Sequence, residues 1–593
     1  MKRLIVALLL LSVTAIADDN LLGLWKAKRR FGPDARGTLV IRREAGGYAA
    51  DMAGRIVPVQ VAGGEMRFEL PDGAGAFRGH LRDGAIDGFW FPPKGMGQNA
   101  GGIFVSPVRM KAAGEGKWIG QVVPFDDDFT FYLLLRQRPD GTTGAFLRNF
   151  ERDFGGQIGV DQFVRDGNKV KLTSKRGDVN GTYDPERDVI TLVFPNRGGS
   201  YDFTREGDDS DFYPRGRHPA PYRYRPPLAR DDGWPTGTLE EAGIDRRGIE
   251  AYVQRVLDEP DLEHSELHGL LIARHGKLVL EEYFHGQNRD KLHETRSAAK
   301  SMTATLAGAA MHAGVPLQLS SRVYEVMKFP ADDPRKKAMT LENLLTMAGG
   351  YDCDDTDPKA PGNEEIMINQ EEEPDFYRFT LKVPMKYEPG EKSVYCSSNP
   401  NLALGMIGRA AGEWPLDLFD RLLARPMKID RYAWGIDPAG NPYGGGSVQV
   451  LPRDFMKFGQ LMLDGGTWRG RRLLSRAFVE RASSRLYHNR NVFYGYLWWS
   501  IDYPYKDRVV RTYYAAGAGG QLVFVVPELD LVVAHYAGNY TVPLKTISDT
   551  DREFLPRFIL PAVREPGDDK NAPVVWREFT SPYGPSQDGS RVH

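Results

Sequence analysis

An internal repeat occupies the first 206 residues, and it constrains the fold of the chain more than any other feature. The segment 23–29 (GLWKAKR) is echoed by the segment 116–122 (GKWIGQV), and glycine landmarks then follow in the same order in both copies. Both copies alternate apolar and polar residues in short runs broken by Asp-Gly turns, which is typical of antiparallel strands. We expect two tandem β modules, residues 18–110 and 111–206, or one β domain with an internal duplication.

The first residues have the pattern of an export signal. Lys2 and Arg3 precede an apolar run over 4–11, and small residues follow up to Ala17. A charged start, a short apolar run and an A-x-A site predict a secretory signal peptide, residues 1–17. The run is too short to cross a bilayer. We therefore expect a periplasmic or secreted protein, cleaved near Ala17, with no membrane span after the signal is removed.

Beyond the repeat, the pattern changes twice. A stretch rich in Pro, Arg and Asp predicts a linker over 207–231, and the last residues, 565–593, predict a flexible tail. Between them, residues 232–564 show two strand patterns, a long helical middle and several further strands. This order predicts an α+β domain, in which a central antiparallel sheet is flanked by helices.

Composition excludes several classes of function. A chain of 593 residues is expected to form several domains. Its net charge of −2 and its pI near 6.6 give no basic footprint for nucleic acid. Cysteine and histidine do not cluster at the spacing of a zinc site, so we expect no metal.

A serine and a lysine lie one helical turn apart in the segment 294–314 (ETRSAAKSMTATLAGAAMHAG). Ser297 and Lys300 are three residues apart, so their side chains share one face of a helix. Apolar residues recur there at helical spacing, which indicates a buried side. Burial disfavours the charged form of lysine, and such an amine can accept a proton from serine. Because Ser-x-x-Lys also arises by chance, an ordinary helix with a surface lysine is the alternative.

Two further segments support a catalytic interpretation. Tyr395 follows a Pro-Gly turn and precedes an apolar helical start, and a tyrosine held beside an ammonium group can act as a general base. In YYAAGAGGQ a glycine-rich turn joins two strands, which allows backbone N–H groups to approach a substrate carbonyl, as an oxyanion hole requires. The sequence contains neither a G-x-S-x-G elbow nor an H-E-x-x-H zinc motif.

The order Ser297-x-x-Lys300, then Tyr395, then a small-residue strand end at 515–520, resembles the serine β-lactamase and penicillin-binding-protein superfamily. The resemblance spans nearly all of 232–562 and is closest to class C-like esterases and 6-aminohexanoate-dimer hydrolases. It implies a serine hydrolase without a cofactor, in which Ser297 is the acylated nucleophile and Lys300 and Tyr395 activate it. It also implies an oxyanion hole formed by the backbone N–H groups of Ser297 and Ala518.

Departures from the family pattern bear on the substrate. Ser397 stands where the family has an asparagine, and Ala515 replaces a basic residue that helps to hold the substrate carboxylate in β-lactam-hydrolysing relatives. We therefore expect a small ester, amide or peptide-like substrate. We also expect Ser397, Gly517, Trp498 and Tyr514 to line the substrate site, although the aromatic residues could equally belong to the core.

Two alternatives remain open. One is a catalytically silent protein that contacts a cell-envelope polymer or a partner through the β repeats, and the other is a true β-lactamase or D-peptidase. The joint presence of Ser297, Lys300 and Tyr395 favours a working hydrolase.

The two cysteines, Cys353 and Cys396, also permit two interpretations. In the fold that the chain resembles, the loop containing Cys353 lies near the wall that carries Tyr395. A disulfide is therefore feasible in an oxidising compartment, and a pair of inert buried thiols is the alternative.

Overall fold

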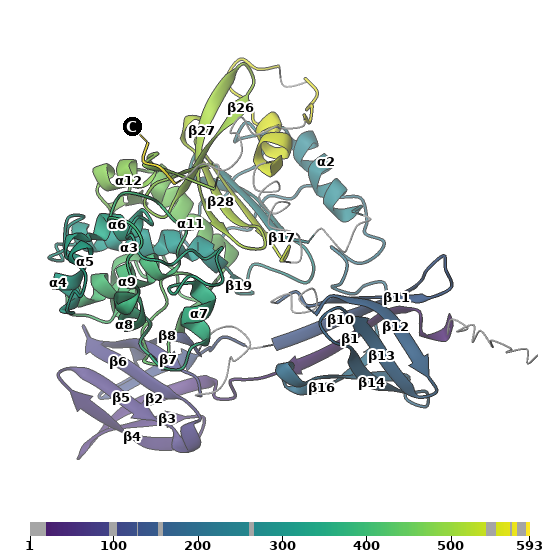
Figure 1. The fold of residues 1–593 in the computed structure, drawn as a ribbon, viewed down its shortest axis with the longest axis horizontal. Coiled ribbons are helices and arrows are strands. Elements are labelled where there is room, and N and C mark those ends of the chain that lie inside the picture. The colour runs from purple at the N-terminus through teal and green to yellow at the C-terminus, as the bar shows by residue number, and fades with distance from the viewer. Residues whose placement is uncertain are drawn as a thin grey trace, which may run out of the picture. The chain divides into compact units, whose positions relative to one another are not determined.

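The structure is a computed structural model that describes residues 19–93, 103–126, 128–151, 158–259, 266–490, 492–540, 553–569, 572–577 and 589–592 (Figure 1). The predicted signal peptide lies outside this part of the chain. Contacts divide the described residues into two compact units, one formed by the residues up to Arg30 with Asp128–Phe212 and the other by Phe31–Asp127 with the residues from Tyr213 onward. Among the described helices, none has the length and apolarity needed to cross a bilayer.

The first unit is a closed barrel, called barrel A here. Its strands, in order around the barrel, are β1 (Gly23–Arg30), β10 (Asp128–Gln137), β11 (Thr143–Arg148), β12 (Val160–Asp166), β13 (Lys169–Ser174), β14 (Val179–Asp184), β15 (Val189–Phe194) and β16 (Gly199–Arg205). Large apolar side chains such as Trp25 and Phe131 are fully buried. The Arg205 guanidinium covers the Trp25 ring at 4.1 Å. Barrel A is therefore built on its own aromatic core.

A second ring of strands, called barrel B, belongs to the second unit. It consists of β2 (Gly37–Glu44), β3 (Gly47–Met52), β4 (Arg55–Ala62), β5 (Glu65–Glu69), β6 (Ala76–Arg82), β7 (Ala85–Phe91), β8 (Ile103–Ala112) and β9 (Lys117–Val122). The ring closes because β9 pairs with both β2 and β8. Asp83 and Gly84, with φ of 51° and 78°, form a two-residue turn of the kind predicted by the Asp-Gly pairs.

The two barrels have exchanged their first strands. Counted along the sequence, β1–β8 and β9–β16 are equivalent sets, and Gly79 and Gly181 both lie in the sixth strand of their set. However, β1 pairs with β10 and β16 in barrel A, whereas β9 pairs with β2 and β8 in barrel B. The spatial units therefore differ from tandem modules of residues 18–110 and 111–206. Alternation and turn signals are local and specify strands, but they do not specify which sheet a strand completes.

The remainder of the second unit, residues 213–593, is called the C-terminal domain. Its main sheet is antiparallel and has the order β18 (Lys277–Tyr283), β17 (Leu267–Arg274), β29 (Leu531–Ala537), β28 (Gln521–Val526), β27 (Arg508–Gly517), β26 (Trp499–Tyr505), β25 (Val492–Tyr494) and β24 (Tyr487–Asn489). Strands from the two ends of the domain thus lie side by side, as β17 and β28 do around β29 (Figure 1).

Helices and short elements fill the interval between β18 and β24. They are β19 (His293–Glu294), η4 (Arg296–Ala299), α3 (Lys300–His312), α4 (Val323–Met327), α5 (Pro334–Ala338), α6 (Leu341–Leu345), α7 (Glu364–Asn369), α8 (Phe376–Lys382), α9 (Ser398–Ala411), α10 (Pro415–Phe419), η5 (Asp420–Ala424), β20 (Tyr432–Ile436), β21 (Val448–Val450), α11 (Pro452–Leu463), β22 (Thr467–Trp468), β23 (Arg471–Arg472) and α12 (Arg476–Ala482). Outside this interval lie α2 (Arg246–Leu257), η7 (Leu555–Ile559) and η8 (Leu560–Ala562).

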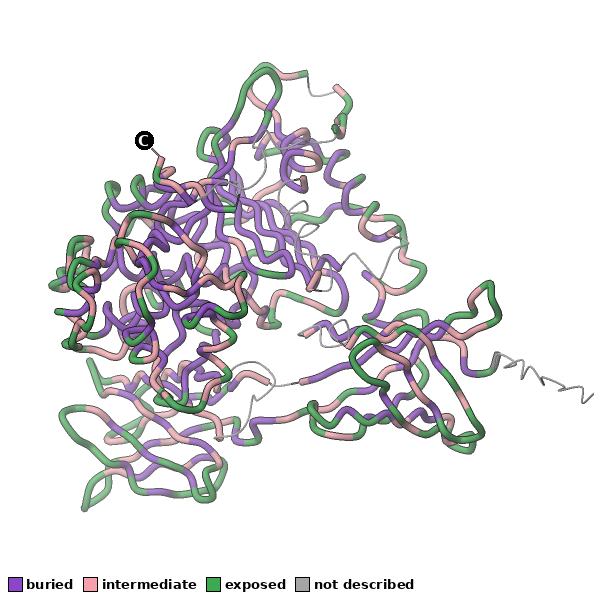
Figure 2. The backbone as a smooth tube through the Cα atoms, in the orientation of Figure 1, coloured by how far each residue is buried: buried purple, intermediate pink, exposed green. Residues whose placement is uncertain are grey.

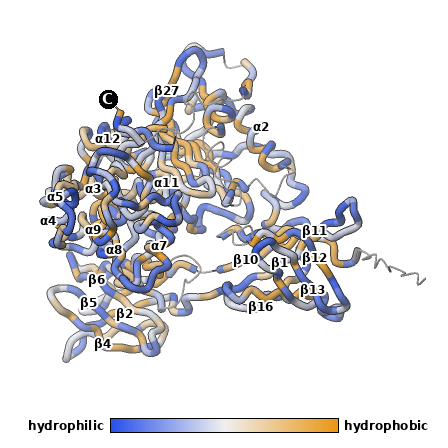
Figure 3. The backbone as a smooth tube through the Cα atoms, in the orientation of Figure 1, coloured by the Kyte–Doolittle hydropathy of each residue, from blue (hydrophilic) through white to orange (hydrophobic). Residues whose placement is uncertain are grey.

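The core of the domain lies between this sheet and its helices. Helix α3 is buried at every residue from Lys300 to Ala310, and α11 packs on β28 and β29. Figure 2 shows the sheet strands and α3 as largely buried, and Figure 3 shows that apolar residues concentrate in the strands beside α11. A helix buried on all sides gains its stability mainly from packing, and the small residues of α3 permit close neighbours.

Barrel B is joined to the C-terminal domain by a shared sheet. Strand β8 pairs with β20, with Val105 opposite Trp434, and the sheet continues through β21 to β19. Ion pairs cross the same junction, among them Arg78–Asp417 at 3.3 Å, Arg109–Asp420 at 3.0 Å and Arg425–Asp87 at 2.8 Å. Barrel B and the C-terminal domain therefore form one packed body.

The predicted linker and tail make specific contacts where the structure describes them. In the linker, Tyr224 is buried and its hydroxyl donates to the carbonyl of Val279 at 2.8 Å. In the tail, the Gly589 carbonyl accepts from the Ser393 N–H at 2.9 Å, and the Ser590 carbonyl accepts from the His488 N–H at 2.9 Å. These residues are anchored although they lack regular helix or strand.

Strand exchange leads to a prediction about Trp25. Replacing it with alanine should destabilise barrel A by about 3–5 kcal/mol, because a fully buried tryptophan leaves a large cavity. Limited proteolysis with mass spectrometry should then find the first cuts within 128–205. The counterpart in β9 is the half-buried Trp118, and Trp118→Ala should instead open 37–122, to a smaller extent. Early cleavage of 37–112 in Trp25→Ala would contradict the exchange.

Candidate active site

The serine of the Ser-x-x-Lys motif lies at the junction between β19 and α3. After β19 the backbone turns sharply, and Arg296 adopts a positive φ of 49°. The Thr295 N–H donates to the Val448 carbonyl at 3.0 Å, and the Arg296 N–H donates to Glu294 Oε1 at 3.0 Å. Ser297 follows in η4 and is half-buried. A non-glycine residue with positive φ is strained, and such strain is found preferentially at functional sites.

Lys300 is directed at the Ser297 hydroxyl. Its Nζ donates to Ser297 Oγ at 2.8 Å and to the Gly445 carbonyl at 2.5 Å, although only 2% of the lysine is exposed. A Cβ on Gly445 would lie 2.4 Å from the Tyr443 hydroxyl oxygen and 3.1 Å from the Ser397 carbonyl. Glycine is therefore required where this carbonyl approaches the ammonium group.

Tyr395 completes the group. Lys300 Nζ lies 5.1 Å from the centre of its ring. The ring stacks on Trp499 with centroids 5.6 Å apart, and the Arg490 guanidinium carbon lies 4.1 Å from the ring centre. The Tyr395 carbonyl accepts from the Asp355 N–H at 3.0 Å. The fold thus brings together Ser297, Lys300 and Tyr395, which are far apart in sequence.

The end of β27 lies against the backbone before the serine. A Cβ on Gly517 would come within 2.4 Å of the Thr295 carbonyl oxygen and 2.9 Å of the Ala298 nitrogen. Only glycine permits this approach, which brings the chain at 517–518 beside η4. Gly517 and the exposed Ala518 therefore lie where the sequence pattern predicted the oxyanion turn.

Three residues predicted to line the substrate site are used elsewhere. Ser397 is fully buried, and its N–H and Oγ both donate to Asp355 Oδ2 at 2.7 Å. Trp498 and Tyr514 are buried in the core, where Trp498 packs edge-on against Tyr513 and Tyr514 against Phe524. Neighbouring residues point to opposite sides of an extended segment, so it is Trp499 that reaches Tyr395.

Sequence reasoning missed an acidic pair behind the site. Asp355 accepts from Ser397, and its Oδ1 accepts from the Glu364 N–H at 3.0 Å. Glu364 in turn accepts from the Tyr443 hydroxyl. Burial, reinforced by the Glu364 charge and opposed by the Lys300 ammonium, raises the pKa of Asp355 to about 6. No motif surrounds these carboxylates, and the crowding of Asp in the segment 352–357 was the only available signal.

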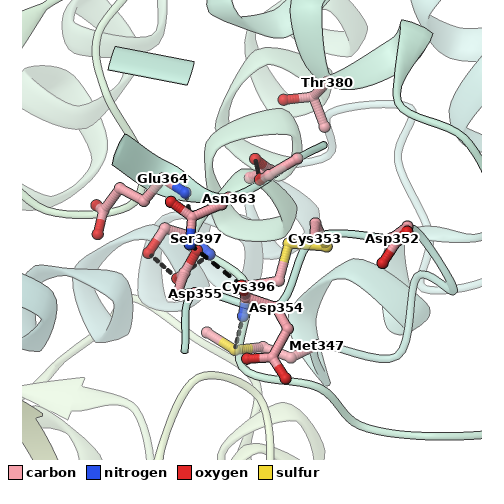
Figure 4. The surroundings of a disulfide bond; sticks show 12 residues. Met347, Asp352, Cys353, Asp354, Asp355, Asn363, Glu364, Thr380, Cys396 and Ser397 are labelled. Atoms are coloured by element: carbon pink, nitrogen blue, oxygen red, sulfur yellow. Dashed lines mark hydrogen bonds between the residues drawn. A yellow bond between two sulfur atoms is a disulfide. The ribbon is translucent and has the colours of Figure 1, made fainter. Parts of the chain in front are cut away.

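A disulfide joins Cys353 to Cys396, with Cα atoms 5.5 Å apart (Figure 4). Both cysteines are buried, and Cys396 directly follows Tyr395. Of the two interpretations that the sequence left open, the structure contains the bonded one.

His268 and His293 are paired with each other and with the groups beside them. His268 Nδ1 and His293 Nε2 lie 2.8 Å apart, and His268 Nε2 lies 2.5 Å from Glu266 Oε1. His293 Nδ1 pairs with the Glu294 carbonyl, and burial together with His268 holds the pKa of His293 well below its usual range. Within the described ranges no three His, Cys, Asp or Glu side chains are grouped to hold a metal ion.

Much of the C-terminal domain matches a known protein family. The sequence model of the β-lactamase family matches residues 261–543. This confirms the superfamily predicted from the sequence. The predicted order of an N-terminal β region followed by a β-lactamase-like domain is also confirmed.

Part of the chain is similar to a 6-aminohexanoate-dimer hydrolase of Paenarthrobacter ureafaciens. The two are 25% identical over 242 residues, which cover 39% of this chain and 61% of that relative. Among solved structures, a Bacillus anthracis protein assigned as a 6-aminohexanoate-dimer hydrolase has 17% identity and a TM-score of 0.43, covering 50% of this chain and 80% of its own. A class C β-lactamase has 12% identity and a TM-score of 0.38, covering 49% and 90%.

The position of the disulfide leads to a prediction about turnover. Reduction should lower kcat for a p-nitrophenyl ester more than it changes KM, because the bond holds the backbone beside Tyr395. Opening the loop between positions 43 residues apart should also destabilise the fold by about 4 kcal/mol on the chain-entropy model. Dithiothreitol should leave the matched double variant Cys353→Ala/Cys396→Ala unchanged. An equal loss in that variant would show that the reductant acts elsewhere.

Proposed function

We propose that the protein is a serine hydrolase that cleaves ester or small amide bonds through an acyl-enzyme on Ser297. The observation that carries this proposal is the 2.8 Å contact between Lys300 Nζ and Ser297 Oγ beneath the Tyr395 ring. A serine is a weak nucleophile until a base within hydrogen-bond reach takes its proton. The match of residues 261–543 to a hydrolase family supports the same chemistry.

The proposed reaction has two halves. Ser297 Oγ attacks the substrate carbonyl carbon while its proton passes to the Lys300/Tyr395 pair. The backbone N–H groups of Ser297 and Ala518 would hold the oxyanion. As the C–O or C–N bond breaks, the pair returns the proton to the leaving alcohol or amine. A water molecule then gives a proton to the pair and attacks the acyl carbon. As the Oγ–C bond breaks, the pair returns that proton to Ser297 Oγ, which releases the acid and restores the serine.

The side chains of the strand beside the serine favour a substrate that has no carboxylate for the protein to bind. Ala515 is buried, and Ala516 is half-buried at the positions where β-lactam-hydrolysing relatives carry basic and hydroxyl side chains. Neither alanine can bind a carboxylate. We therefore propose neutral esters, small amides or short peptide-like compounds as the substrate class.

Export is proposed as well. The N-terminal pattern of residues 1–17 supports a secretory signal, and the Cys353–Cys396 disulfide suits an oxidising compartment such as the periplasm or the exterior. Contact of the barrels with a cell-envelope polymer stays a prediction.

Substitutions at the three residues test the mechanism. Ser297→Ala should reduce kcat by about 10⁴-fold or more and abolish fluorophosphonate labelling, and Lys300→Ala and Tyr395→Phe should each cost about 10³-fold. The Lys300/Tyr395 double variant should be far from additive, because the two groups act as one unit. Ser301→Ala, one turn further along α3, is the matched control. Labelling of Ser297→Ala, or none of the wild type, would favour the silent binding protein.

A substrate panel tests the proposed specificity. We expect kcat/KM for p-nitrophenyl acetate or butyrate to exceed that for nitrocefin by at least about tenfold, since the loss of one charged carboxylate contact is worth roughly 1.5–3 kcal/mol. Ser297→Ala measured alongside gives the blank, and EDTA should leave the rates unchanged. Faster hydrolysis of nitrocefin than of either ester would instead indicate a true β-lactamase.

A further inference from the structure

The turn that carries Tyr395 is held in place by the segment 353–355. The disulfide fixes Cys396 to Cys353, and the Asp355 N–H donates to the Tyr395 carbonyl at 3.0 Å. The Asp355 carboxylate then receives both donors of Ser397. Figure 4 shows Asp355 and Ser397 facing each other beside the disulfide. Residues 395, 396 and 397 are therefore each tied to the same short segment.

The carboxylate of Asp355 is used on both of its oxygen atoms. Oδ2 accepts the Ser397 N–H and Oγ at 2.7 Å each, and Oδ1 accepts the Glu364 N–H at 3.0 Å. Hydrogen bonds to an ionised carboxylate are about twice as strong as neutral ones. Three such bonds make Asp355 the centre at which the loop 353–355, helix α7 and the start of α9 meet.

These contacts lead back to the lysine. Glu364 accepts from the Tyr443 hydroxyl, and Tyr443 adjoins Gly445, whose carbonyl accepts from Lys300 Nζ. On the other side, Ser397 leads through Cys396 to Tyr395, whose ring lies over the same ammonium group. Through these contacts Asp355 connects the segment of Tyr395 with the segment of Gly445, and both segments contact the Lys300 ammonium group.

We propose that Asp355 is a positioning residue of this site, whose ionised carboxylate holds the 395–397 turn so that Tyr395 stays over Lys300. The inference rests on the proposed acyl-transfer function and adds a residue that no family motif marks. It also explains why the N–H and the hydroxyl of Ser397 both donate to Asp355.

The protonation state of Asp355 gives the inference a distinctive signature. The charged or titratable groups that face it are Glu364 from α7, Lys300 from α3 and Tyr443 from the loop before β21. With its pKa raised to about 6, Asp355 is ionised above that pH and neutral below it. Asparagine has the shape of the neutral acid. Wild type and Asp355→Asn should therefore behave alike at pH 5 and differ at pH 8.

The experiment compares kcat and KM for p-nitrophenyl acetate between pH 5 and 8 in wild type, Asp355→Asn and Asp355→Ala. Asp355→Ala should lower kcat by up to about 100-fold with little change in KM, because it frees the turn. The wild-type to Asp355→Asn ratio should rise through pH 6 towards about tenfold, the difference between charge-assisted and neutral bonds. Asp354→Asn is the control, since Asp354 accepts from Thr356 within its own loop.

Two outcomes would overturn the inference while the proposed function stands. One is an unchanged kcat in Asp355→Ala with normal fluorophosphonate labelling, and the other is a wild-type to Asp355→Asn ratio that does not vary with pH. Absence of both turnover and labelling in the wild type would refute the proposed function instead. In that case melting temperatures of Asp355→Ala, Ser397→Ala and the double variant decide: non-additive losses support the contact, and additive losses overturn it.

Discussion

A lysine with almost no exposure needs oxygen partners inside the protein, and the site is arranged around the partners that Lys300 finds. An unpaired buried ammonium group would cost several kcal/mol, so the serine one turn earlier and the carbonyl of Gly445 are structural requirements for burying Lys300. Glycine is required at position 445, because any Cβ there would collide with Tyr443. One buried charge thus fixes the relation between α3 and the loop that leads into β21.

The sheet that runs into this site begins in barrel B. Strand β19 leads directly to the turn before Ser297, and β21 follows the loop of Gly445; both belong to the sheet that β20 and β8 continue. The backbone that precedes Ser297 and the backbone that follows Gly445 are therefore hydrogen-bonded, through successive strands, to barrel B. The part-buried pairs Arg109–Asp420 and Arg425–Asp87 lie along the same junction.

Local patterns in the sequence were sufficient for much of this architecture. The spacing of Ser297 and Lys300 implied a shared helical face, and apolar alternation with Asp-Gly turns implied hairpins; the superfamily and the division into a β region and a β-lactamase-like domain are confirmed. The role of Trp498 was not recoverable, because an aromatic residue beside a strand looks the same whether it lines a cleft or a core. Asp355 was missed because its function depends on a partner, Ser397, that lies 42 positions away and is brought close only by the tertiary fold. The exchange of β1 and β9 was hidden because alternation and turn signals specify strands but do not specify which sheet a strand completes.

That exchange has a consequence for the history of the chain. A lineage that lost either repeat would keep seven strands of one barrel together with the first strand of the other, and would have to rebuild closure from a strand adapted to a different neighbour. In the present structure each barrel is closed by the first strand of the other repeat. After the exchange, neither repeat can be lost or moved without removing a strand from the other barrel. Because barrel B continues through β8 into the sheet beside Ser297, the hydrolase domain inherits both repeats together.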